Sequence, residues 1–236
     1  MASTKVKAVV IGGVNVKEKD RLVSLYTLER GNMSISLRGV RGEKAKLKFA
    51  KELFCFADFL IEEGKISKVV TAVDIIDDFR DIAKDIDKYF EACAIIDVVS
   101  KFGEEANPAL FVSLVKSLKL LCYENLPKYY VFNKFLIEFF KIMGWNFIGQ
   151  NCSSCGATLG IKYLNLEIGE LVCPACKNVF SVQVSESCYK GICLLGSTDF
   201  DGLETLNLPE RIEMEICKIL VKNYEFRTGY KFNTFS

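Results

Sequence analysis

The chain has 236 residues and half of them are apolar, which is enough to bury a substantial core in one large domain or several small ones. Its 31 basic and 30 acidic side chains give a formal net charge of +1, so the overall charge predicts no particular partner. The absence of histidine excludes His-dependent acid–base catalysis, Ser–His or Cys–His nucleophile pairs, and a His-ligated catalytic zinc.

The charges are distributed unevenly along the chain. Residues 1–70 carry 14 Lys or Arg against 8 Asp or Glu, whereas residues 71–236 carry 17 against 22. Such asymmetry predicts that one face of the protein meets a polyanion, while the remainder is ordinary solvated surface.

Neither an export signal nor a membrane span is expected. Lys5 and Lys7 are followed only by a short apolar run, Ala8 to Ile11, which two glycines end. No uncharged stretch approaches the ~18 apolar residues of a membrane span. Six cysteines outside the motif described below lie mostly among apolar residues, which is typical of reduced thiols buried in a reducing cytoplasm. We therefore expect a soluble cytoplasmic protein.

The first third of the chain is rich in strand patterns. Five β-branched or alternating runs are separated by turn residues; they are Lys5–Val16, Arg21–Leu28, Met33–Val40, Leu53–Glu62 and Ile66–Ile76. Five short strands in about 75 residues fit a small closed barrel, and the OB type is one candidate.

From residue 78 onward the apolar period becomes helical. Apolar stripes predict helices that begin near residues 79, 107, 127 and 209, the last three at or beside a proline. Asp97 is the one polar residue that interrupts the first stripe. Wide stripes rich in aromatic residues are more typical of a packed helical core than of a cofactor site.

Two CxxC pairs separated by 17 residues form the most specific pattern in the chain; the four residues are Cys152, Cys155, Cys173 and Cys176. Four thiols spaced in this way can close a tetrahedron around one Zn²⁺, and Gly156 and Pro174 favour the turns that this requires. Such a site has no open position for water or substrate, so its zinc would be structural. Two disulfides or four ordinary buried thiols are the alternatives.

Together these patterns predict an α+β multidomain protein. Residues 1–78 would form the OB-type barrel, and residues 79–149 and 181–236 the two parts of a helical bundle. A zinc ribbon or finger over residues 150–180 would be inserted between those two parts, with Ile161–Ile168 as a strand between its cysteine pairs.

Residues 38–51 form a basic segment with a single acid; its cations are Arg38, Arg41, Lys44, Lys46, Lys48 and Lys51. Glycines at 39 and 42 predict a flexible loop at a strand end, suited to phosphate contacts that depend little on base sequence. Tyr26 and Phe49 are the nearest aromatic residues in sequence, either for base stacking or for the core. A merely solvated charged loop is the alternative. The chain has no GxxxxGK[ST] phosphate loop.

With these parts in this order, the chain resembles the RecO family of bacterial DNA repair and recombination mediators along nearly its whole length. The resemblance is carried by the order of the parts and by five stretches: EKDRLVSLYTLERGNMS at 18–34, RGVRGEKAK at 38–46, NPALF at 107–111, MGW at 143–145, and the CxxC pairs. No one stretch is highly specific, but their order and spacing together are. The terminal YEFRTGYKFNTFS departs from the family pattern of a His and a Lys-Ser-Arg run.

The resemblance implies a non-enzymatic protein that binds single- and double-stranded DNA and anneals complementary strands. With RecR, such a protein helps RecA replace the single-stranded-DNA-binding protein, whose acidic C-terminal tail it binds. It implies a cytoplasmic, nucleoid-associated bacterial protein with one structural zinc held by the four clustered cysteines. It also assigns DNA contacts: Arg38, Arg41 and Lys44, with Arg21, Lys46 and Lys48 as weaker candidates.

A groove for the acidic tail is expected on the helices. Lys116 or Lys119 would receive the carboxylate beside Leu110 and Phe111. Helical lysines are usually only solvated, which is the alternative interpretation of this pair.

Two other functions compete with the mediator. One is a zinc-ribbon, OB-fold module that binds RNA or a protein in the transcription or translation machinery. The other is an enzyme with a carboxylate metal site at Asp74, Asp77, Asp78 and Asp81, although these residues are also typical of the acidic start of a helix.

Overall fold

The computed structural model describes residues 3–16, 20–37, 40, 48–64, 68–145 and 148–232. Contacts between residues divide the chain into two compact units, Met1–Glu124 and Asn125–Ser236. This division falls inside the predicted helical segment 79–149. The four-part division of the sequence remains a prediction, and each unit is considered by itself.

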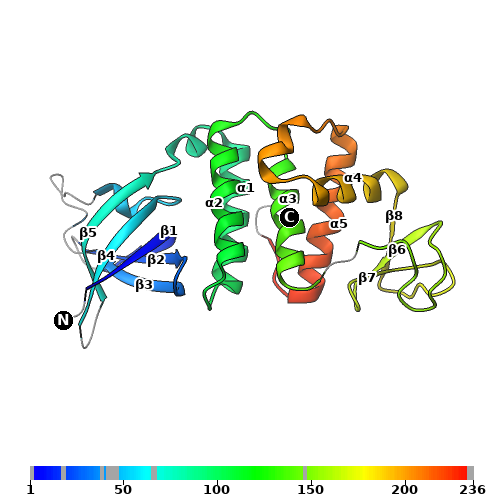
Figure 1. The fold of residues 1–236 in the computed structure, drawn as a ribbon, viewed down its shortest axis with the longest axis horizontal. Helices are drawn as coiled ribbons and strands as arrows, with labels where there is room; N and C mark the ends of the chain where they lie inside the picture. The colour runs from blue at the N-terminus through cyan, green and yellow to red at the C-terminus, as the bar shows by residue number, and fades with distance from the viewer. Residues whose placement is uncertain are drawn as a thin grey trace. The chain divides into compact units, whose positions relative to one another are not determined.

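In the first unit, five strands form one curled sheet (Figure 1). They are β1 Ser3–Asn15, β2 Arg21–Thr27, β3 Gly31–Leu37, β4 Phe56–Glu63 and β5 Lys68–Asp77. The hydrogen-bonded order is β1-β2-β3-β5-β4, and β1 pairs with both β2 and β4. The ring closes between β3 and β5 through one parallel pair among the described residues, Ser36 with Val69.

All five predicted strands are confirmed, with small shifts at their ends. Burial alternates along β3, because Ile35 and Leu37 are buried and Ser34 is exposed. β1 passes through Gly13, whose missing side chain lets β2 approach, since a Cβ there would lie 2.7 Å from the Leu22 carbonyl oxygen. β4 starts at Phe56, because Phe54 turns the backbone at φ 71°.

The strands enclose a continuous apolar core. Its buried side chains come from every strand, chiefly Val6, Ala8, Val10, Val23, Leu25, Ile35, Leu37, Ala57, Phe59, Ile61 and Val70. Burial of these groups away from water stabilises the barrel without any bound ligand.

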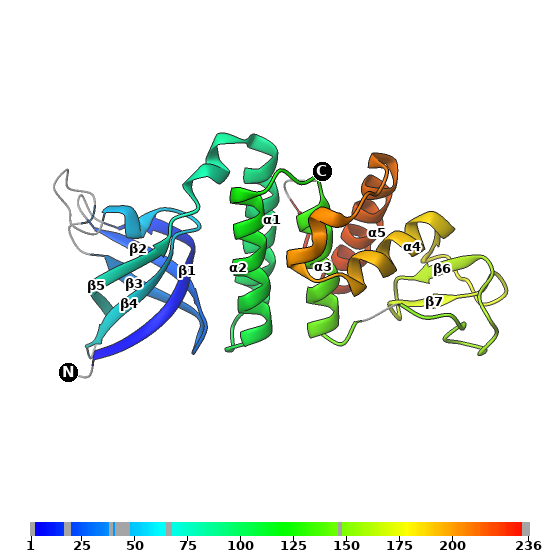
Figure 2. The same ribbon diagram turned by 45° about the horizontal axis from the view of Figure 1, so that its top comes forward.

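Two helices complete the first unit and run side by side (Figures 1 and 2). They are α1 Ile86–Phe102, preceded by the 3₁₀ turn η2 Arg80–Lys84, and α2 Pro108–Tyr123. The side chain of Asn107 caps α2 by accepting from the Leu110 N–H at 3.0 Å, as the Asn-Pro pair predicts. The Tyr26 hydroxyl of β2 donates to the Asn107 carbonyl at 3.3 Å, which ties the helices to the barrel.

Among its described residues, the second unit contains three helices, α3 Tyr130–Ile142, α4 Glu186–Ser197 and α5 Glu210–Thr228. α3 packs on both α4 and α5, and nearly all its side chains are buried. α4 was not predicted from the sequence, although Ser185 caps it by accepting from the Cys188 N–H at 3.1 Å. The short 3₁₀ turn η3 Phe200–Thr205 links α4 to α5.

The end of the described chain is packed against α5. Phe232 is 2% exposed and stacks on Tyr224 at a ring-centroid distance of 4.6 Å. Its ring also meets Phe132 edge-on at 5.4 Å. The residues that depart from the family pattern therefore contribute to the core of this unit.

A small antiparallel sheet lies between α3 and α4 in the chain. Its strands are β6 Lys162–Asn165, β7 Glu170–Val172 and β8 Ser181–Val184, in the order β7-β6-β8. The predicted strand over Ile161–Ile168 is confirmed as β6. Among the described residues, no helix is both long enough and apolar enough to span a membrane.

Candidate metal centre and nucleic-acid surface

Both CxxC segments form tight loops at the small sheet. In the first, the Cys152 carbonyl accepts from the Gly156 N–H at 2.9 Å, and Gly156 has the left-handed φ of 75° that its lack of a side chain permits. In the second, the Cys173 carbonyl accepts from the Cys176 N–H at 3.0 Å and from the Lys177 N–H at 3.1 Å. Each loop thereby turns its two sulfurs to the same side.

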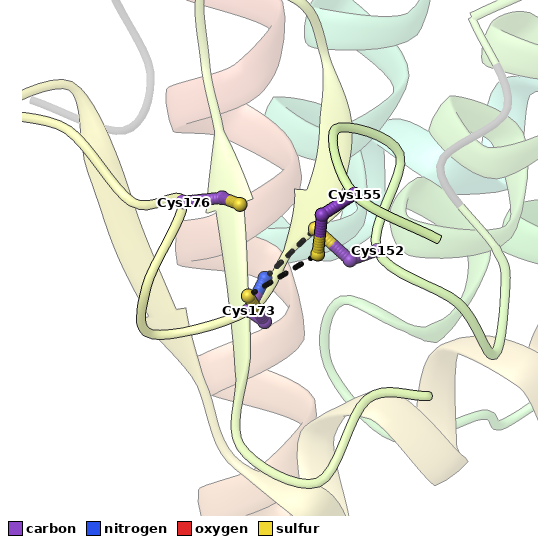
Figure 3. Close-up of side chains that lie close together, drawn as sticks. All are labelled: Cys152, Cys155, Cys173 and Cys176. Atoms are coloured by element: carbon purple, nitrogen blue, oxygen red, sulfur yellow. Dashed lines mark hydrogen bonds between the residues drawn. The ribbon is translucent and has the colours of Figure 1, made fainter. Parts of the chain in front are cut away.

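The two loops bring all four sulfurs together, and they lie within 4.8 Å of one another (Figure 3). The Cys155 and Cys173 Sγ atoms are 3.8 Å apart, far beyond a disulfide bond. Zn–S bonds of about 2.3 Å in a tetrahedron place sulfurs about 3.8 Å from one another. The cluster therefore fits one tetrahedral metal ion.

The electrostatics of the cluster favour a thiolate, the form that binds metal, at Cys152. The Cys173 N–H donates to the Cys152 Sγ at 3.3 Å, and this bond is the main reason that the pKa of the Cys152 thiol falls to about 6. Hydrogen bonds with the other cysteines favour the protonated form of the Cys176 thiol and raise its pKa to about 12. A divalent cation would replace the remaining protons.

The predicted disulfide alternative is wrong for this structure, because all ten cysteines are free and each lies within the described residues. The six outside the cluster are buried or half-buried, as predicted. Burial raises the pKa of both Cys55 and Cys188 to about 12, which keeps these thiols protonated and inert.

The four-cysteine module is anchored to α5 by an arginine. The Arg227 guanidinium donates to the Ile168 carbonyl at 3.0 Å and lies 4.6 Å from the centre of the Trp145 ring. Gly169 has a φ of 70°, which favours glycine, and a Cβ there would displace the Arg227 Nη1 atom. Sequence reasoning missed this anchor because it joins residues almost 60 positions apart.

Most of the predicted DNA contacts lie outside the described residues. These are Arg38, Arg41, Lys44 and Lys46; Lys48 begins the short 3₁₀ turn η1 Lys48–Lys51, and only its backbone is described. Phe49 lies in the same turn.

Arg21 is the one predicted contact whose side chain is described. It begins β2 and pairs with Leu37, the last residue of β3, so it lies where the chain leads into the basic segment. Its guanidinium donates to the Asn15 side-chain oxygen at 3.4 Å. Tyr26, the predicted stacking candidate, is fully buried in the unit and is unavailable to a nucleobase.

Other cations of the barrel already have acidic partners. Lys5 and Lys7 both pair with Asp58, at 2.9 and 2.8 Å, and together they lower the pKa of that carboxyl. This face of the barrel is therefore closer to neutral than its lysines alone indicate.

Two of the residues predicted to line the tail-binding groove are buried by the packing of α2. Leu110 and Phe111 are 1% and 4% exposed, and the Phe111 ring lies 5.9 Å from Tyr26 and 6.0 Å from Phe56. These two side chains face the interior and do not line an exposed groove. Lys119 is exposed and Lys116 half-buried on the same helix.

The carboxylates considered as an enzymatic metal site do not gather together. Asp78 pairs with Arg80, Asp81 pairs with Lys84 at 2.8 Å, and Asp77 accepts from the Tyr123 hydroxyl at 2.8 Å. Among the described residues, only the four cysteines form a group suited to a metal ion.

The chain thus combines a curled five-stranded sheet, a set of helices and a four-thiol module. Two family models match it, one after the other along the sequence. The model described as Recombination protein O N terminal matches residues 1–79, and Recombination protein O C terminal matches residues 83–234. The chain belongs to the RecO family, as its sequence motifs predict.

Alignments with curated relatives cover most of this chain and most of each relative. "DNA repair protein RecO" of Clostridium novyi is 25% identical over 222 residues, which are 92% of this chain and 86% of the relative. The protein of the same name from Acetivibrio thermocellus is 26% identical over 93% of each chain. That of Frankia casuarinae is 27% identical over 83% of this chain and 82% of the relative.

Proposed function

We propose that this protein is a mediator of recombinational DNA repair. Membership of the RecO family supports a role in DNA repair and recombination. The finer proposal is that it binds single- and double-stranded DNA, anneals complementary strands and, with RecR, assists RecA loading on strands coated by the single-stranded-DNA-binding protein. It acts without a catalytic group, in the bacterial cytoplasm at the nucleoid.

The DNA-binding surface is proposed on the N-terminal unit, with the sheet as an OB-type barrel. The observation that carries this proposal is the position of Arg21 beside the end of β3, from which the basic segment 38–51 continues. Phosphate groups from two strands would be held by Arg38, Arg41 and their neighbours. Neutralising both backbones lowers their mutual repulsion, and base pairing then completes the annealing.

The four cysteines are proposed to hold one structural Zn²⁺. Their sulfur separations and the lowered pKa of Cys152 support this, because both suit a closed tetrahedral thiolate site. The ion would supply folding energy to the module and no chemistry, since all four coordination positions are filled by the protein.

The partner interaction is proposed to involve the acidic C-terminal tail of the single-stranded-DNA-binding protein. Lys116 and Lys119 of α2 remain the candidate cations, without Leu110 and Phe111. Annealing of two complementary oligonucleotides, each coated with that protein, tests both activities together. Acceleration that disappears when the tail is removed is the expected result; no acceleration by folded protein would contradict the proposal.

A second arm separates the mediator from an RNA-binding ribbon protein. Binding to single-stranded DNA and to RNA of matching sequence is compared, together with annealing of uncoated strands. A strong preference for RNA without strand annealing would favour the transcription or translation alternative.

Salt dependence tests the proposed DNA contacts directly. Replacing both Arg38 and Arg41 with Ala should reduce the steepness of log affinity against log salt by about 1.4–1.8, because each lost phosphate contact contributes about 0.7–0.9. The measurement is DNA binding by anisotropy at several salt concentrations. Lys218→Ala combined with Lys222→Ala, at two exposed positions of α5, is the matched control. An unchanged slope in the Arg38/Arg41 double variant would show that the DNA contacts lie elsewhere.

A further inference from the structure

The first unit contains a pocket that the proposed DNA-binding surface does not use. Its volume is about 430 Å³, within the range of ligand pockets. It lies where the turn before β4 meets η2 and α1. Five of its lining residues are uncharged, Leu53, Phe54, Phe79, Ala83 and Tyr89, and three are charged, Glu52, Asp78 and Arg80. The walls are therefore largely apolar and aromatic.

Two of these wall residues have an unusual backbone conformation. Phe54 and Phe79 have φ of 71° and 43°, and only one other non-glycine residue of the described chain, outside the pocket, has a positive φ. Bulky residues rarely adopt this conformation, and it concentrates at ligand clamps and other functional sites.

Hydrogen bonds hold both residues in place. The Phe54 N–H donates to the Val10 carbonyl at 2.9 Å, and the Phe79 N–H donates to the Asp77 carboxylate at 3.1 Å. The pocket is thus built by the fold and does not depend on side chains that happen to leave a gap.

The aromatic surface continues out of the pocket along α1. The Tyr89 ring lies 5.7 Å from Phe54 and 6.3 Å from Phe90, which is 45% exposed. Ile86, one turn earlier on the helix, is 70% exposed. A short segment lying over this rim would bury these side chains together with its own.

The charge around the pocket selects the kind of segment. Residues 77–87 carry five acidic and two basic side chains, and both basic ones, Arg80 and Lys84, are paired with acids of the same stretch. This surface repels phosphates and an acidic tail, whereas it attracts a cationic partner.

We propose that this pocket binds a protein partner through an apolar or aromatic side chain flanked by Lys or Arg. The anchor would enter between Phe54, Phe79 and Tyr89, and its basic neighbours would meet the carboxylates of residues 77–87. Anchors of this kind dominate the affinity of small interfaces. The basic segment ends at Lys51, which pairs with the pocket-lining Glu52 at 3.7 Å, so the test must separate peptide binding from DNA binding.

The test uses a labelled, end-blocked peptide, KRAFARK, and full-length protein in a fluorescence anisotropy titration. Saturable binding is expected, and the peptides KRAAARK and EDAFADE should bind at least tenfold more weakly. Ala83→Phe, which fills the pocket from an exposed position, should weaken KRAFARK at least tenfold. Val112→Phe, at a 49% exposed position of α2 outside the pocket, should leave binding unchanged.

Asp87→Lys provides a second variant at an exposed position and should weaken KRAFARK through charge alone. Absence of saturable KRAFARK binding, equal binding of the three peptides, or full binding by both the Ala83→Phe and Asp87→Lys variants would overturn the proposal. So would an Ala83→Phe variant that loses affinity for oligo(dT) and keeps its affinity for the peptide, because the pocket would then receive a nucleobase. Loss of annealing by the double Arg38/Arg41 variant concerns the proposed function alone.

Discussion

The N-terminal barrel and the four-cysteine module are both small β structures, yet different interactions hold them together. The barrel closes five strands around a continuous apolar core, with Phe59 and Leu25 fully buried. The module has three strands of three or four residues, and its loops converge on sulfur atoms. Burial of apolar surface is sufficient for the first, whereas a structure as small as the second usually needs a metal or disulfides.

The comparison teaches that residues with similar local patterns can have different physical roles. Cys55 is fully buried in the barrel core and acts as a small apolar side chain. Cys155 is exposed, and its role is to place its sulfur in the four-cysteine cluster. Removal of metal should therefore destabilise the module and leave the barrel folded. Substitutions in the barrel core should destabilise the barrel and leave the metal site intact.

The largest expected effect is loss of metal from the module. Replacing both Cys152 and Cys155 with Ser should reduce bound zinc from about one ion per chain to none, because a structural site contributes apparent binding energy of about 10–16 kcal/mol. Amide hydrogen exchange should accelerate over residues 150–184 and stay slow over β1–β4. Cys193→Ser is the matched control; equal acceleration in the barrel would show that the regions are not separate.

Phe59→Ala tests the converse case, destabilisation of the barrel with an intact metal site. The substitution removes a fully buried ring from the barrel and should cost about 3–5 kcal/mol of unfolding free energy. Urea unfolding followed by hydrogen exchange measures this loss, while the zinc content should not change. A Phe59→Leu variant, which keeps most of the apolar volume, should lose much less. Metal loss in Phe59→Ala would contradict independent stabilisation.

The second unit also contains a buried carboxyl that makes its stability depend on pH. Burial raises the pKa of Glu213 to about 7, from an ordinary value near 4.5. Between these two values the unfolded chain releases its proton first, so stability falls as the pH rises and the loss is complete above pH 7. Glu213→Gln should remove this loss and be more stable than the native chain by about 1–3 kcal/mol at pH 8.

Thermal or urea unfolding of both chains from pH 4.5 to 8.5 measures this difference. Because both chains carry the same cysteines, metal release contributes equally and cancels. Glu204→Gln, at an exposed position of η3, should behave like the native chain. A constant difference between Glu213→Gln and the native chain at every pH would contradict titration as the cause.

The smallest effects should come from two helix caps, one in each unit. Asn107→Ala and Ser185→Ala each remove a side chain that accepts from a helix N–H, at 3.0 and 3.1 Å, and each should cost about 1 kcal/mol. Hydrogen exchange should speed up in α2 for the first variant and in α4 for the second. Conservative changes to Asp or Thr should restore most of the loss. Effects that spread to both units would mean that the units unfold together.

How well the sequence predicted each element follows from how local its determinants are. α2 was recognised because Asn107 and Pro108 mark its start, and these signals act within one turn. α4 was missed because Gly191 and Gly196 weaken its helical pattern. Gly191 lies close to α5, and a Cβ there would meet the Ile216 side chain at 2.7 Å, so the close packing of the two helices favours glycine.

Sequence by itself determined the four-thiol cluster, the five strands and the family, because CxxC spacing, alternation and motif order are properties of neighbouring residues. Tertiary structure alone decided which face of α2 is buried, since Phe111 packs on rings contributed by β2 and β4. It also decided the pocket at Phe54, Phe79 and Tyr89, whose walls come from separate segments. Such contacts depend on where distant parts of the chain meet, and no local pattern carries that information.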